Sequence, residues 1–150
     1  DDDWTTAEHG HITLRLPPKW TVKSDPPHPK GAQRLQATNA SNTKMLILLL
    51  IPNDGSLSVD ALIQGFGQQL MARSPNVKME LRQHNTPEFF GIPGTVYGID
   101  GNDPDDPMTI RMAGTMKGPA TSLLAIFVFN HDALKELQLM GESLTVKLPQ

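Results

Sequence analysis

The sequence predicts an α+β domain built on a mainly antiparallel β-sheet of about six to seven strands, flanked by two main helices. Two segments carry this prediction, Lys44–Ile51 and Ala120–Phe129, because their side chains are apolar on both alternating faces. A strand of that kind is buried from above and below, so the sheet needs a cover on each face. Short, turn-rich connections favour antiparallel pairing of neighbouring strands.

Two segments define the predicted domain organisation. Residues 1–10 are polar and acidic, with Trp4 as the one anchor, and are expected to form a flexible leader. Residues 11–150 are expected to form a single α/β domain, because a chain of this length buries roughly 70% of its unfolded surface in one core.

Alternating side chains predict the first strands. Residues 12–16 alternate between apolar and polar side chains, and Pro17-Pro18 ends that strand because proline cannot donate to a ladder. Further strands are expected over 20–24 and 33–38. The doubly apolar strand Lys44–Ile51 then follows.

A helix is expected to begin after Ser58. Serine is a good N-cap residue, and Asp60 would lie at the positive end of the helix dipole. Ser74-Pro75 ends the pattern. The helix would cover one face of the sheet with an apolar stripe that consists of Val59, Leu62, Ile63, Phe66 and Leu70.

The second half of the chain predicts strands over 77–81 and 95–99, followed by a long hairpin within 107–130. Asn130 can cap a second helix, and a last short strand is expected over 144–148. In the hairpin, one strand face carries Ile110 together with Met108, Met112 and Met116. Methionines spaced along a strand lie too far apart to ligate one ion, so this face is expected to be core on which a helix packs.

Composition excludes several classes of function. A net charge of −3 argues against a nucleic-acid binder, and no run reaches the ~18 apolar residues that a membrane span needs. The absence of cysteine excludes a disulfide, a Cys-ligated metal and a Cys nucleophile. Residues 9–52 carry six Lys or Arg against one Asp, whereas residues 1–8 and 53–150 are acidic. That segregation indicates either a partner surface or a solvated mixture.

No motif predicts an enzyme or a cofactor. Ser41 and Lys44 match S-x-x-K, but they precede a strand, where residues three apart point to opposite faces, so we interpret them as a turn. Nucleophile-elbow, P-loop, dinucleotide and H-E-x-x-H patterns are missing from the sequence. We therefore predict no catalytic residue and no bound cofactor.

Two weak metal patterns also remain without a complete ligand set. The acidic segment 100–107 resembles a Ca²⁺ loop, but Pro104 and Arg111 occupy positions where the EF-hand pattern requires other residues. His9 and His11 are two apart and have no third ligand fixed by the sequence. We expect an ordinary acidic loop and no metal site.

The order of these elements resembles the Mog1/PsbP-like superfamily. The matching features are the LPPKW strand end at Leu16–Trp20, the LLLIP strand end, the helix after Ser58, the turn at Gly91–Gly94, the long hairpin and the closing helix. Within that superfamily the chain is similar to bacterial DcrB-like proteins and to effector chaperones of type VI secretion. The resemblance implies an antiparallel sheet flanked by helices, a non-enzymatic role in binding, and often export.

These observations lead to a first functional hypothesis, an exported periplasmic or secreted accessory domain that binds a protein or lipid-like partner as a monomer or homodimer. A start without Met also favours export. The alternative is a cytoplasmic dimeric chaperone for a type VI secretion effector, and an uncharacterised enzyme comes third.

The candidate partner-binding residues are arginines on strand faces opposite to the expected core. If these faces belong to one open sheet surface, three guanidiniums converge into a patch for an acidic segment or an anionic head group; the alternative is three unrelated surface arginines. Exposed aromatic residues form the second choice. The candidates are Arg15, Arg34 and Arg111, followed by Trp20, Phe89 and Phe90.

Overall fold

The computed structural model describes residues 3–9, 12–24, 33–41, 44–72, 79–84, 88–89, 92–93, 96–101, 109–116, 120–129 and 139–146. Its elements, in chain order, are β1 (Thr5–His9), β2 (Ile12–Leu16), β3 (Thr21–Ser24), β4 (Gln33–Thr38), β5 (Met45–Pro52), α1 (Val59–Ala72), β6 (Met79–His84), β7 (Glu88–Phe89), β8 (Ile92–Pro93), β9 (Val96–Gly101), β10 (Thr109–Met116), β11 (Thr121–Phe129) and β12 (Thr145–Val146).

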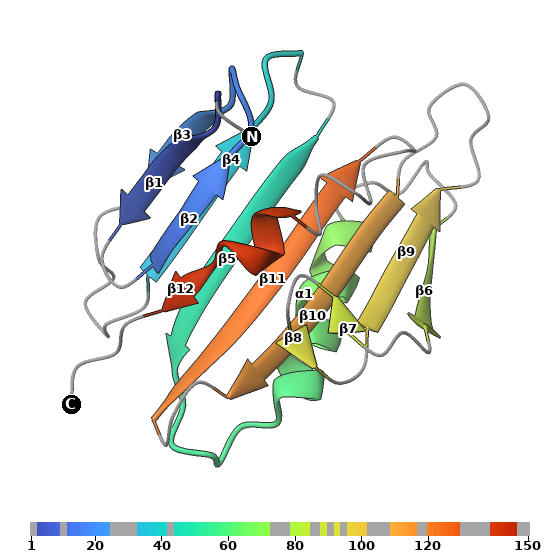
Figure 1. The fold of residues 1–150 in the computed structure, drawn as a ribbon. Helices are drawn as coiled ribbons and strands as arrows, with labels where there is room; N and C mark the ends of the chain where they lie inside the picture. Colours follow the sequence, from blue (N-terminus) through green and yellow to red (C-terminus); the bar gives the residue numbers. More distant parts are fainter. Residues whose placement is uncertain are drawn as a thin grey trace.

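The main sheet has seven strands in the order β3-β4-β5-β11-β10-β9-β6, and every neighbouring pair is antiparallel (Figure 1). Its centre is the pair β5 and β11, the two strands whose sequences are apolar on both faces. The predicted hairpin is formed by β10 and β11, paired from Thr109 opposite Phe129 to Met116 opposite Ser122. The predicted α+β class with a mainly antiparallel sheet is confirmed.

A three-stranded sheet, β1-β2-β12, lies against one face of the main sheet (Figure 1). The apolar side chains of β2 pack there with those of β4, β5 and β11 in one buried cluster, which we call the sandwich core. Phe127 is its largest fully buried side chain. The other members from these strands are Ile12, Leu14, Leu16, Leu35, Ala37, Leu46, Leu48, Leu50, Leu123 and Ala125.

The prediction of a leader over residues 1–10 needs a correction at Thr5–His9. This segment is β1, which pairs with β2 along its whole length. Ala7 is buried in the sandwich core, and Trp4 packs against it. The sequence carries little sign of this strand, because Ala7 is a small residue and Thr5, Thr6 and Glu8 are polar and exposed.

The opposite face of the main sheet carries α1, which starts at the predicted cap. Ser58 Oγ accepts a hydrogen bond from the Ala61 N–H at 3.3 Å, and the Ser58 carbonyl accepts one from the Leu62 N–H at 3.1 Å. Ile63 is buried against β10, where Ile110 and Met112 are also buried. The prediction of a methionine-bearing core face under a helix is therefore confirmed at Met112.

The connection from β5 to α1 is organised by Asn53, a buried polar residue. Its Oδ1 accepts hydrogen bonds from the Gly55 N–H at 2.9 Å and the Leu57 N–H at 3.2 Å, while its Nδ2 donates to the Leu57 carbonyl at 3.0 Å. Its backbone N–H donates to the Ala120 carbonyl at 2.9 Å. The Asn53 side chain thus provides hydrogen-bond partners for the backbone groups of the turn that connects the sheet to α1.

Residues 139–142 are helical and lie over the sandwich core, where Met140 is fully buried. They fall within the predicted second helix, whose expected start at Asn130 lies outside the described residues. The short strand β12 falls within the predicted last strand.

Lys19 adopts a left-handed backbone conformation, with φ at 69°, in the turn between β2 and β3. This conformation costs a residue with a Cβ about 1–2 kcal/mol of folding free energy, whereas for glycine the cost is smaller and entropic. We expect Lys19→Gly to raise the melting temperature by about 2–4 °C, which is roughly 1 kcal/mol for a chain of this size. Lys23→Gly, in the extended strand β3, is the control, and it should lower the melting temperature.

Candidate functional site

The structure separates the three candidate arginines. Directly paired residues of an antiparallel sheet share a face. Arg34 pairs with Leu49, which pairs with Leu124, so Arg34 lies on the face that carries α1. Arg111 pairs with Phe127 of the sandwich core and therefore lies on the opposite face.

Arg15 belongs to the smaller sheet, where it is exposed between the buried Leu14 and Leu16. The three guanidiniums therefore do not form one patch, and the alternative of separate arginines describes their positions. Whether any of them binds a partner remains a prediction. The Arg111 Nη1 donates to the Ile110 carbonyl at 3.0 Å, and Arg111 is half-buried.

The aromatic candidates have different environments. Trp20 is half-buried and packs against the sandwich core, so it is at least partly a structural residue. Phe89 lies in β7, which pairs with β8, but its side chain is outside the described part of the structure. Phe90 lies outside the described residues altogether.

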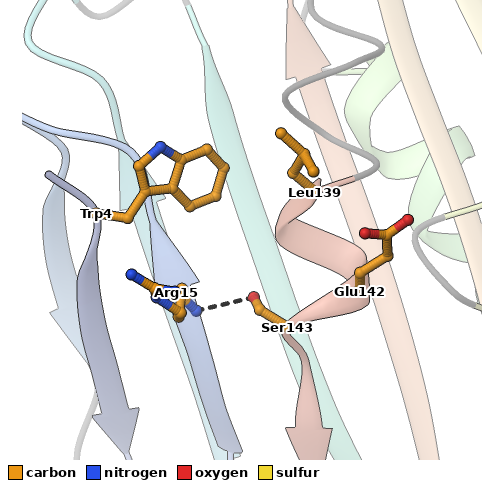
Figure 2. Close-up of a pocket in the computed structure, with 5 residues that line it drawn as sticks. All are labelled: Trp4, Arg15, Leu139, Glu142 and Ser143. Atoms are coloured by element: carbon orange, nitrogen blue, oxygen red, sulfur yellow. Dashed lines mark hydrogen bonds between the residues drawn. The ribbon is translucent and has the colours of Figure 1, made fainter. Parts of the chain in front are cut away.

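Arg15 lines a hollow between the smaller sheet and the helical residues 139–142 (Figure 2). Trp4 and Arg15 stand on one side, and Leu139 and Glu142 on the other. The Arg15 backbone N–H donates to Ser143 Oγ at 2.9 Å, and that hydroxyl donates to the Met140 carbonyl at 2.7 Å. These bonds hold the carboxyl-terminal segment against β2.

The hollow has a volume of about 210 Å³, below the ~300 Å³ at which ligand pockets usually begin. Its lining combines an indole, one cation and one anion at the junction of two packed elements. We interpret it as the seam where the carboxyl-terminal segment docks, with room for a single side chain of another molecule.

A second and more apolar depression lies on the other face of the main sheet, between α1 and β5. We call it the α1 groove. Its volume is about 270 Å³, and its lining has no charged side chain. The sheet contributes Leu49, Ile51 and Leu124, and the helix contributes Ala61, Leu62, Gly65, Phe66 and Gln69.

The α1 groove exists because the helix covers only part of its face. The α1 backbone contacts β10, β6 and β9, which all lie on one side of the central strands β5 and β11 (Figure 1). Leu49, Ile51, Leu62 and Phe66 are consequently half-buried, although they are large and apolar. Exposed apolar side chains that adjoin one another mark interaction sites more often than isolated ones do.

Two small residues, Ala61 and Gly65, line the helix side of this groove. Together with Gln69 they follow one another at intervals of four along that side. A Cβ added at Gly65 would meet no atom within 4 Å. The stripe is visible in the sequence as A-x-x-x-G-x-x-x-Q, but its meaning depends on which side of the helix is left uncovered.

The other chemical patterns acquire no support from the described residues. Among these residues no group of three or more His, Asp or Glu side chains could hold a metal ion, and no helix is long and apolar enough to cross a membrane. Of the acidic segment 100–107, the first two residues belong to the end of β9, and residues 102–107 lie outside the described residues, as does His11. Asn39 organises the turn before β5, since its Oδ1 accepts from the Lys44 N–H at 2.9 Å and its Nδ2 donates to Ser41 Oγ at 3.3 Å.

Comparison with known proteins identifies the fold. A solution structure of cyanobacterial PsbP (CyanoP) from Synechocystis sp. PCC 6803 superposes with a TM-score of 0.58 at 7% sequence identity, covering 97% of this chain and 93% of that one. The chain therefore has the Mog1/PsbP-like fold that its element order predicts. No family model matches the sequence, and no curated protein matches it.

Proposed function

We propose that this chain is a non-enzymatic accessory domain that binds another protein through the α1 groove. The observation that carries the proposal is the row of half-buried apolar side chains beside α1, on a face that the helix covers only in part. Their exposure costs hydration free energy, roughly 25 cal/mol per Å² of apolar surface, which a partner would recover on binding. Export to the periplasm or the medium, which the resemblance implies, accompanies this proposal as a prediction.

A protein partner fits the groove better than a lipid-like ligand does. Sites for small ligands typically bury 70–90% of the ligand in an enclosed cavity of ~300–1,000 Å³. The α1 groove is smaller and opens along the helix, so it would cover only one side of its occupant. A polypeptide can place an apolar face into such a groove and keep its other face in water.

The proposal is tested by filling the groove. Gly65→Trp places an indole in open space beside the groove, so it should raise the Kd for the partner at least about tenfold without lowering the melting temperature. Gln68→Trp is the matched control, because Gln68 is exposed and does not line the groove. It should leave the Kd unchanged.

The partner is obtained by photo-crosslinking from Ala61 in the native host and is then purified for calorimetry with both variants. Equal affinity of Gly65→Trp and the unmodified chain would contradict the proposal. Light scattering of the purified domain separates a monomer from the homodimer that the chaperone alternative requires.

A further inference from the structure

The rim of the α1 groove has a defined charge on the side away from the helix. Arg34 stands directly beside Leu49 in the groove floor, because the two residues are cross-strand partners. Lys23 pairs with Gln36, which pairs with Ile47, so Lys23 extends the same face toward the sheet edge. Both cations are exposed.

Among the residues that the structure describes, acidic side chains are missing from this part of the surface. The described residues of β3 and β4 and the groove lining contain no Asp or Glu. Asp60 of α1 lies four residues before Gln64, whose Nε2 donates to the Tyr97 hydroxyl of β9 at 3.2 Å. Asp60 therefore belongs to the helix side that faces away from the groove. The charged side chains that the structure describes along the open rim, Arg34 and Lys23, are therefore both positive.

The uncovered part of the sheet has the width of one helix. Strands lie about 4.8 Å apart, so β5, β4 and β3 together extend roughly 10–15 Å beyond β11. A helix with its side chains is about 10–12 Å across and packs on a sheet with one apolar stripe. One additional helix beside α1 would thus cover the half-buried row on β5 and reach Arg34.

From this arrangement we infer that the occupant of the α1 groove is an amphipathic helix of a partner protein with acidic residues along the flank that lies over β4. The inference rests on the proposed function and adds the chemistry of the partner. The apolar stripe fills the groove, and the acidic flank pairs with Arg34 and Lys23. A charged rim of this kind sets orientation and selects between partners more than it adds affinity.

Two synthetic peptides test the inference. Both have about 15 residues, a length at which an isolated helix becomes marginally stable, and both carry the same leucine stripe. One has glutamate along the flank and the other has lysine. We expect the glutamate peptide to bind about three- to tenfold more tightly at low salt, and the preference to shrink at high salt as the Debye length shortens.

Charge-reversal variants test whether the preference for the glutamate peptide arises from Arg34 and Lys23. The double variant Arg34→Glu, Lys23→Glu should abolish or reverse it, with an unchanged circular dichroism spectrum. Lys19→Glu makes the same kind of charge change in the turn between β2 and β3, at an exposed residue that does not line the groove, and should preserve it. A preference that survives in the double variant overturns the inference.

The outcomes also separate this inference from the proposed function. If neither peptide binds at millimolar concentration, or if Gly65→Trp does not weaken binding, the groove is not a helix-binding site and both ideas fall. If both peptides bind equally and Gly65→Trp weakens both, the groove stands and only the acidic flank is refuted. Chemical shift changes mapped onto α1 and β5 locate the binding in either case.

Discussion

Ile126→Asp is expected to prevent the domain from folding. Ile126 lies in the middle of β11, between Ile47 of β5 and Met112 of β10, and it is 2% exposed. These two neighbours offer no polar partner, and an unpaired buried charge costs more than about 4–5 kcal/mol. Because domains of this kind have only about 5–15 kcal/mol of stability, the loss removes most or all of the cooperative transition in a thermal melt.

Val22→Asp is the matched control for this variant. It is also an exchange of a β-branched apolar residue for aspartate in a strand, but Val22 lies on the edge strand β3 and is 41% exposed. It should cost no more than about 1 kcal/mol. Melting temperatures of the two variants that agree within about 4 °C would contradict the central position of β11. Ile126→Ala, which should still fold, measures the packing alone at about 2–5 kcal/mol.

The sheet could be predicted because its strands carry strong local patterns. Apolar residues on both faces of β5 and β11 identify the centre, and the cap at Ser58 with its stripe identifies α1. The strand β1 could not be predicted. This strand joins the smaller sheet through backbone pairing with β2 and buries only the small Ala7 in the core. Neither feature produces an alternating hydrophobic pattern in the sequence.

The candidate site depends on how the strands pair and where the helix lies, and the alternation of apolar and polar residues along one strand does not predict either. The pattern along one strand shows which residues share a face, so the sequence predicts that Arg34 and Arg111 point away from the alternating apolar side chains of their own strands. Which of the two sheet faces each one occupies depends on register across four strands, and the pairings place them on opposite sides. The α1 groove likewise depends on how far the helix is displaced from the sheet centre.

Gly114 explains where α1 meets the sheet. It lies on β10 opposite Leu124, on the helix-bearing face. A Cβ built on Gly114 would lie 2.6 Å from both Leu124 Cδ2 and Val59 Cγ1, and 3.0 Å from Ile63 Cδ1. Two residues of α1 therefore occupy the space that any other side chain at position 114 would need. Because Gly114 has no side chain, the first half of α1 can pack closely against β10.

Gly114→Val should therefore destabilise the domain by about 3 kcal/mol and lower the melting temperature by about 6–12 °C, because overpacking forces Val59 and Leu124 away from their positions. Gly65→Ala is the control, since its Cβ meets no atom within 4 Å and alanine favours a helix by up to about 1 kcal/mol over glycine. It should raise the melting temperature. The displaced helix would also change the α1 groove, so Gly114→Val should weaken peptide binding in addition to stability. A Gly114→Val protein that melts within about 2 °C of the unmodified chain would show that α1 is not seated on β10 at this glycine.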